Sequence, residues 1–152
     1  MKSSLISNDV ILLSKYIVTK CVKDDCPITN LQLQKILYCI QRYFLKHNSA
    51  AFYDEFEAWH FGPCIPNVYY HFCGFGAMPI TNTYNTSLLD FNKETKRVID
   101  DFIEKKRTLA PWDFYDEIMG EGSAWKKAYE PQVGFLKSFK AISFESIRAE
   151  AT

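Results

Sequence analysis

Two histidines and two cysteines fall within one short stretch of the sequence, and these are side chains that zinc prefers. They are His60, Cys64, His71 and Cys73. Their spacing matches neither a zinc finger nor a zinc ribbon, and aromatic residues fill the intervals between them. We therefore expect no bound metal and no other cofactor. The odd number of cysteines, five, indicates free thiols in a reducing, cytoplasmic compartment.

A carboxylate in an apolar stretch is the second candidate for chemistry. Glu57 lies between Phe56 and Trp59, where a carboxylate needs a hydrogen-bond partner. No second catalytic group stands at a defined spacing from it, and the chain has no nucleophile elbow, P-loop or HExxH motif. A structural role is favoured, with Glu57 bonded to backbone amides near Gly62 or at a helix start. An enzyme would instead need one cleft that holds both Glu57 and His60.

The charge balance argues against two classes of protein. The chain of 152 residues has 18 basic and 18 acidic side chains, so its formal net charge is zero. A nucleic-acid-binding domain needs a basic surface, and a membrane-surface protein needs a basic cluster. The run Lys105, Lys106, Arg107 fits a helix end that complements the helix dipole. We expect one domain over residues 1–152, without a signal peptide or membrane span.

Aromatic side chains are concentrated between residues 52 and 75. This segment holds nine of them, interrupted by Gly62, Pro63 and Pro66. A small β element packs fewer rings than this, so some must lie near the surface, where tyrosine and tryptophan commonly anchor protein interfaces. For Trp59 and Phe61, burial in an aromatic-rich core is an equal alternative. The candidate partner-binding residues are Tyr53, Tyr69, Tyr70 and Tyr129.

One helix, residues 30–46, has the clearest signals among the elements that must position these side chains. Thr29 and Gln32 have the spacing of a capping box, and Ile28 and Leu33 occupy the two positions of a hydrophobic staple. The predicted apolar face consists of Leu33, Ile36, Leu37, Ile40 and Phe44. The polar residues expected to lie away from that face are Gln34, Lys35, Gln41 and Arg42.

The remaining pattern predicts short elements on both sides of this helix. Residues 9–22 form a first helix, and residues 55–61 form a strand that ends at Gly62-Pro63, with residues 79–81 as its partner strand. Further helices begin or are capped at Pro66, Asn92, Pro111, Ser123 and Ser143. The sequence thus predicts a mainly α, compact single-domain fold of six or seven helices, with a small β element, a β-hairpin, between the second and third.

The order of these segments resembles the Panacea domain, the SocA-like antitoxin family that includes GepA-like phage-associated proteins. The resemblance lies in LQLQKILYCIQRYFL (31–45), EFEAWHFGPCIPNVYYHF (55–72), SAWKKAYE (123–130) and ISFESI (142–147). The residues that match the family's motifs are Glu57, Ala58, Trp59, Gly62, Pro63, Pro66, Val68, Tyr69, Trp125, Ala128 and Tyr129. Two departures occur: Met119-Gly120 stand where the family often has Thr-His, and Ala124 replaces a proline. No role for that histidine carries over.

The resemblance implies an antitoxin of a toxin–antitoxin system on a mobile genetic element or prophage. Such a protein neutralises a cognate toxin, encoded nearby, by direct protein–protein binding. The resemblance also leaves open an adaptor that delivers its toxin to a Clp protease. A phage counter-defence interaction protein and an enzyme with an unrecognised site are the alternatives from other classes, and a homo-oligomer stays open.

Overall fold

Seven α-helices and a small antiparallel sheet make up the part of the chain, residues 9–130 and 139–150, that the computed structural model describes. The helices are α1 (Val10–Lys23), α2 (Asn30–Lys46), α3 (Pro66–His71), α4 (Lys93–Lys106), α5 (Pro111–Phe114), α6 (Ala124–Ala128) and α7 (Phe144–Arg148). The strands are β1 (Phe56–Trp59), β2 (Gly62–Cys64) and β3 (Ala141–Ile142), and single turns form η1 (Cys73–Phe75) and the π-helical η2 (Tyr115–Met119). The predicted mainly α fold is confirmed.

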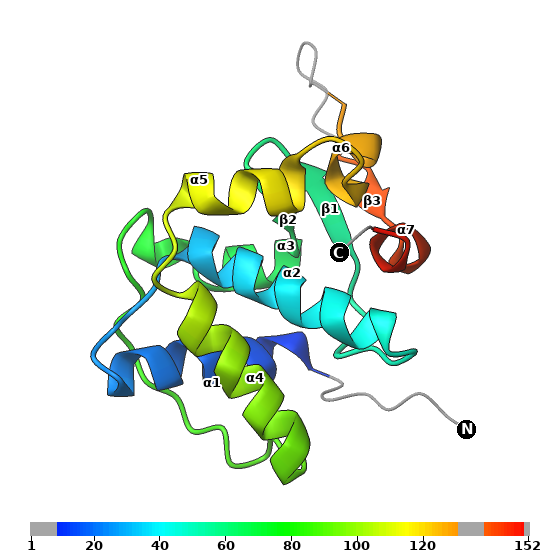
Figure 1. Cartoon of the computed structure of the whole chain (residues 1–152). Coiled ribbons are helices and arrows are strands. Elements are labelled where there is room, and N and C mark those ends of the chain that lie inside the picture. Colours follow the sequence, from blue (N-terminus) through cyan, green and yellow to red (C-terminus); the bar gives the residue numbers. More distant parts are fainter. Residues whose placement is uncertain (1–8, 131–138, 151–152) are drawn as a thin grey trace.

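Helix α2 runs through the middle of the molecule (Figure 1). Helices α1 and α4 lie on one side of it and α5 on the other, while β3, α6 and α7 gather towards its C-terminal end. No helix in the described ranges is both long enough and apolar enough to cross a bilayer.

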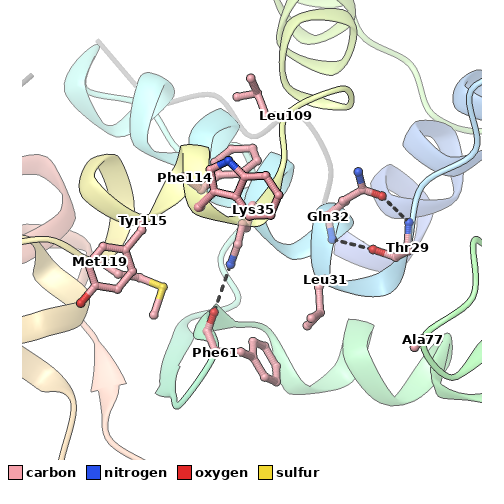
Figure 2. A pocket seen from close by; sticks show the side chains of 11 residues that line it. Thr29, Leu31, Gln32, Lys35, Phe61, Ala77, Leu109, Phe114, Tyr115 and Met119 are labelled. Atoms are coloured by element: carbon pink, nitrogen blue, oxygen red, sulfur yellow. Dashed lines mark hydrogen bonds between the residues drawn. The ribbon is translucent and has the colours of Figure 1, made fainter.

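The start of α2 shows how local sequence fixes a helix boundary. Thr29 Oγ1 accepts a hydrogen bond from the Gln32 amide at 3.2 Å, and Gln32 Oε1 accepts one from the Thr29 amide at 2.8 Å (Figure 2). These two bonds satisfy amides that a helix start leaves without partners. Ile28 and Leu33, at the staple positions, are fully buried. The helix therefore begins at Asn30, as predicted.

The polar side of α2 is buried as well, which the sequence did not predict for Gln34, Lys35 and Gln41. Both glutamines are 0% exposed and Lys35 is 6% exposed. The segment that follows α2 wraps around the helix, and its buried backbone groups need hydrogen-bond partners. Gln34 Oε1 accepts from the Ile65 amide at 2.8 Å, and Gln41 Nε2 donates to the Phe52 carbonyl at 2.7 Å. These polar side chains thus hold the aromatic-rich segment against the helix.

The hairpin lies between α2 and α3, but its second strand differs from the prediction. Strand β2 pairs with β1 directly, Trp59 opposite Gly62, so the sharp turn between them replaces the partner expected at residues 79–81. Gly62 has a φ of +129°, which L side chains rarely adopt. Strand β2 is an edge strand, where the missing amide of Pro63 is tolerated. Ile80, in the segment wrongly predicted as a strand, instead donates its amide to the Ile28 carbonyl at 2.8 Å.

Strand β3 adds to the other edge of β1, which the sequence did not predict. Phe56 lies opposite Ile142, and both side chains are fully buried. The sheet order is therefore β2-β1-β3, with the strand from the far end of the chain beside the first. Only two residues of β3 pair, too few for the alternating pattern that reveals a strand in a sequence.

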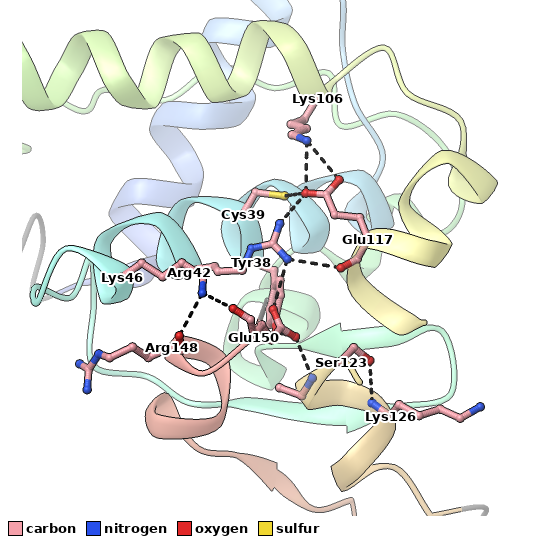
Figure 3. A network of polar contacts seen from close by, with 11 residues as sticks. Tyr38, Cys39, Arg42, Lys46, Lys106, Glu117, Ser123, Lys126, Arg148 and Glu150 are labelled. Carbon is pink, nitrogen blue, oxygen red and sulfur yellow. Dashed lines mark hydrogen bonds and ion pairs between the residues drawn. The ribbon is translucent and has the colours of Figure 1, made fainter. Parts of the chain in front are cut away.

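Glu150 fastens the C-terminal segment to α2 and α6 (Figure 3). Its side chain is 4% exposed. Oε2 accepts hydrogen bonds from the Tyr38 hydroxyl at 2.8 Å and the Ala124 amide at 2.7 Å, and Oε1 pairs with Arg42 at 3.2 Å. We call this group of four residues the Glu150 clamp. Because every partner is a donor, the buried carboxylate is well satisfied.

Turn η2 is joined to the same side of α2 by a second carboxylate. Glu117 pairs with Arg42 and with Lys106, the latter at 3.2 Å (Figure 3). Partial burial raises the pKa of Glu117, but the Lys106 and Arg42 charges lower it by more, so the pKa lies below its usual value of 4.5. These ion pairs fix η2 over the middle of α2.

Candidate partner-binding surface

The hairpin, α3 and the segment before β3 bring four aromatic rings together around Trp59. The ring centroid of Trp59 lies 5.3 Å from that of Tyr69 and 5.0 Å from that of Phe139, and Phe61 and Tyr70 are within 6.1 Å. These five residues are the Trp59 cluster, which lines a depression of about 600 Å³. Trp59 is 8% exposed, whereas Tyr70 is 62% exposed. The cluster is therefore partly core and partly surface.

Glu57 and His60 both line this depression, the arrangement that an enzyme would need. Glu57 Oε1, however, accepts a hydrogen bond from Trp59 Nε1 at 2.9 Å, so its partner is an indole and not the expected backbone amide. His60 is exposed, and within the described structure no hydrogen bond or ion pair joins it to Glu57. The geometry thus gives Glu57 a role in orienting Trp59 and provides no general acid–base pair.

Two of the segments on which the resemblance rests meet at a pair of tryptophans. Trp125 Nε1 donates to the Trp59 carbonyl at 2.6 Å, and the Tyr129 ring stacks on Trp125 at 4.6 Å. The motif residues that are buried are Ala58, Trp59, Gly62, Pro63, Val68 and Trp125. The half-buried ones are Glu57, Pro66, Tyr69, Ala128 and Tyr129. The motif therefore forms a junction between the hairpin, α3 and α6.

The four candidate anchor tyrosines differ in exposure and in place. Tyr53 and Tyr70 are 61% and 62% exposed, whereas Tyr69 and Tyr129 are half-buried. Tyr69 and Tyr70 belong to the Trp59 cluster, and Tyr129 packs on Trp125. Tyr53 lies in the loop between α2 and β1 and does not line the depression. Accessible contact area is thus greatest at Tyr53 and Tyr70.

A larger depression, which the sequence reasoning missed, lies between α2 and α5 (Figure 2). We call it the Lys35 groove; its volume is about 720 Å³. It is lined by Thr29, Leu31, Gln32, Lys35, Phe61, Ala77, Leu109, Trp112, Phe114, Tyr115 and Met119. Trp112 is 77% exposed and Tyr115 48%. A signal was present, because these two aromatics are three residues apart and so share the outer face of their helix.

Lys35 lies at the base of this groove with few polar partners. Its Nζ donates to the Phe61 carbonyl at 3.0 Å (Figure 2). Burial lowers the pKa of Lys35 below its usual value of 10.5, because the charged form loses hydration. No carboxylate among the described residues forms an ion pair with it. The groove therefore combines apolar walls with an ammonium group that lacks a counter-charge.

The candidate metal ligands are not brought together. Cys64 is buried, whereas His60, His71 and Cys73 are exposed. The described residues contain no group of three or more His, Cys, Asp or Glu side chains that could hold an ion. All five thiols are free, and burial raises the pKa of Cys21 to about 11, which makes it a poor nucleophile. Metal-free function stays a prediction.

Comparison with known proteins finds one matching family and one similar protein. Residues 33–126 match the family described as "Antitoxin SocA-like, Panacea domain". The "Antitoxin SocA" of Caulobacter vibrioides (strain NA1000 / CB15N) is 38% identical over 77 residues, covering 50% of this chain and 41% of that protein. The match thus spans about two fifths of the relative's length. No solved structure matches. Lys35, Trp59 and Trp112 lie inside the matched family span, whereas Tyr129 lies beyond it.

Proposed function

This chain belongs to the antitoxin SocA-like Panacea domain family, and on that premise we propose that it is an antitoxin that binds its toxin directly. The observation that carries the proposal is an exposed aromatic surface on one side of the molecule. The Trp59 cluster and the Lys35 groove share Phe61, so the two depressions adjoin. Together they expose Tyr70, Trp112 and Tyr115. Exposed aromatics of this kind are the usual anchors of protein interfaces.

Binding, and not turnover, is the chemistry that this surface supports. The carboxylate of Glu57 is occupied by the Trp59 indole, and no acid–base pair accompanies it among the described residues. A net charge of zero also favours a protein partner over nucleic acid. We therefore propose stoichiometric neutralisation of a toxin encoded beside this gene.

Co-expression with the adjacent open reading frame tests the proposal. Growth rescue together with co-purification of the two chains in fixed stoichiometry is the expected result. If a substoichiometric amount of the purified protein inactivates the purified toxin in the absence of a protease, neutralisation is catalytic and the proposal is wrong. If rescue disappears in cells that lack the Clp protease while the complex still forms, the protein acts as an adaptor.

A further inference from the structure

We infer that the Lys35 groove is the contact site for the toxin, and that it takes an apolar segment of that protein whose acidic side chain pairs with the Lys35 ammonium. The inference rests on the proposed function for the identity of the partner. The chemistry expected of the ligand rests on three observations about the groove itself.

The first of these is the incomplete set of hydrogen bonds around Lys35. A lysine ammonium has three N–H donors, and the bond to the Phe61 carbonyl uses one of them. The group lies close to Gly62 and Met119, since a Cβ added at Gly62 would stand 3.1 Å from Lys35 Nζ and 3.2 Å from the Met119 sulfur. A buried cation without an opposite charge is unfavourable, and a carboxylate brought by a partner relieves this.

The second is the apolar character of the walls. Three large apolar side chains that are exposed in the described structure line the groove, and they are Leu31, Trp112 and Tyr115. They come from two elements, α2 and the α5–η2 segment, so they flank Lys35 from both sides. An interface core of this type is apolar, with aromatic anchors around a small number of polar groups.

The third is the state of the neighbouring cations. Lys106 is paired with Glu117, and Arg107 is paired with Asp24 at 2.7 Å. A polyanion such as nucleic acid would need several unpaired cations in a row, whereas this groove offers one. A single acidic side chain on an apolar segment fits that charge pattern.

A protein segment also suits the shape of the groove better than a small carboxylic acid. Pockets for small molecules enclose most of the ligand surface. Here Trp112 is 77% exposed, so the wall that it forms stands open to solvent. An open apolar wall is covered when a second protein surface packs against it.

Titration of the purified toxin into the purified full chain tests the inference. Lys35→Met removes the charge and keeps the apolar stem, and it should weaken binding about thirtyfold or more. Trp112→Ala should weaken it to a similar degree, about thirtyfold. The matched control is Leu88→Ala, because Leu88 is 88% exposed and does not line the groove. The affinity of the Leu88→Ala variant for the toxin should stay within about twofold of that of the wild type.

One outcome of this titration separates the inference from the proposed function. If the toxin binds Lys35→Met and Trp112→Ala as tightly as the wild type, the groove is not the contact site and the antitoxin function stands. Trp112 is exposed, so its variant folds even where the Lys35 variant does not.

A selection from phage-displayed random linear peptides on the immobilised full chain tests the groove without a toxin. The expected peptides carry Asp or Glu next to large apolar residues, and they lose binding to Lys35→Met and to Trp112→Ala. Enriched peptides without an acidic residue, binding that survives both substitutions, or no enrichment at all would overturn the inference. If acidic peptides bind as expected but the neighbouring gene encodes no toxin, the proposed function fails and the groove chemistry stands.

Discussion

Two charged side chains, Glu150 and Lys35, are buried at α2, and their surroundings are opposite. Glu150 meets a hydroxyl, a guanidinium and a backbone amide, all of them donors. Lys35 meets one carbonyl oxygen, and no carboxylate of the described chain pairs with it. A satisfied buried charge stabilises the fold that supplies its partners. A buried charge that lacks a counter-charge in its own chain can gain one when a second protein binds and supplies it.

Lys35 and the two α2 side chains that bind Glu150 lie on a single stripe of the helix. Lys35, Tyr38 and Arg42 are three and four residues apart, so they follow one another along one face of α2. Turn η2 covers this stripe, with Glu117 on Arg42 and Met119 close to Lys35. The same turn therefore neutralises one cation and forms a wall around the other.

Removal of the Glu150 carboxylate should have the largest effect on stability and so test the contrast between the two buried charges most directly. Glu150→Ala leaves the Tyr38 hydroxyl and the Ala124 amide without their acceptor, while Arg42 keeps Glu117 as a counter-charge. It should therefore lower the free energy of unfolding by about 3 kcal/mol. Urea denaturation measures the change. The control is Glu145→Ala, an exposed glutamate on the nearby helix α7, whose free energy of unfolding should stay within about 0.5 kcal/mol of the wild type. Equal urea midpoints for the two variants would show that the Glu150 clamp does not stabilise the fold.

Substitution of Lys35, the buried cation without a counter-charge, should change stability in the opposite direction. Lys35→Met removes a buried charge that has no ion-pair partner in the described structure, so the free energy of unfolding should hold or rise by about 1 kcal/mol. The same urea experiment measures it. A clear loss of stability would mean that the bond to the Phe61 carbonyl supports the fold, and the contrast with Glu150 would then break down.

The pH dependence of that gain should sharpen the contrast. Burial lowers the pKa of Lys35 in the folded protein below 10.5. The contribution of this side chain to stability is therefore complete only above pH 10.5, and it is lost as the pH falls through the folded-state pKa. The advantage of Lys35→Met over the wild type should therefore be greatest near neutral pH and shrink towards pH 10.5. Both proteins contain the same buried thiols, such as Cys21, which reduce stability at alkaline pH. This contribution is common to both and cancels in the difference. A constant difference would contradict a desolvated ammonium.

The smallest effects on stability should come from the exposed tyrosines. Tyr53→Ala and Tyr70→Ala remove side chains that are 61% and 62% exposed, so each should change the free energy of unfolding by about 0.5 kcal/mol or less. Thermal melting at fixed pH is sufficient to measure this. A larger loss at Tyr70 would show that its ring contact with Trp59 belongs to the core and not to a binding surface.

Local signals in the sequence predicted the frame of the fold well. The capping box at Thr29 and the helix starts at Asn92 and Ser123 depend on residues three positions away, and in the structure these caps form. The hairpin was predicted in the right place but with the wrong second strand. The turn before Gly62 is two residues long, and its formation depends on a positive φ that no periodicity reveals.

Long-range partners account for what the sequence did not predict. Gln34 and Gln41 resemble surface residues until the chain after α2 folds back and presents its backbone amides and carbonyls to them. The Lys35 groove requires α5 and α2 to meet, although they are separated by more than sixty residues. The tyrosine candidates were chosen for residue type, whereas Trp112 and Tyr115 were treated only as part of a short helix.

The pairing of β3 with β1 also bears on the order in which the molecule is completed during synthesis. Contacts between residues far apart in sequence form late, and a chain made from its N-terminus folds from that end first. Until residues 139–150 emerge from the ribosome, β1 lacks one neighbour and Arg42 lacks the Glu150 carboxylate. In a nascent chain interrupted before residue 150, the Tyr38 hydroxyl and the Ala124 amide thus lack their acceptor, and Arg42 depends on Glu117, which it shares with Lys106.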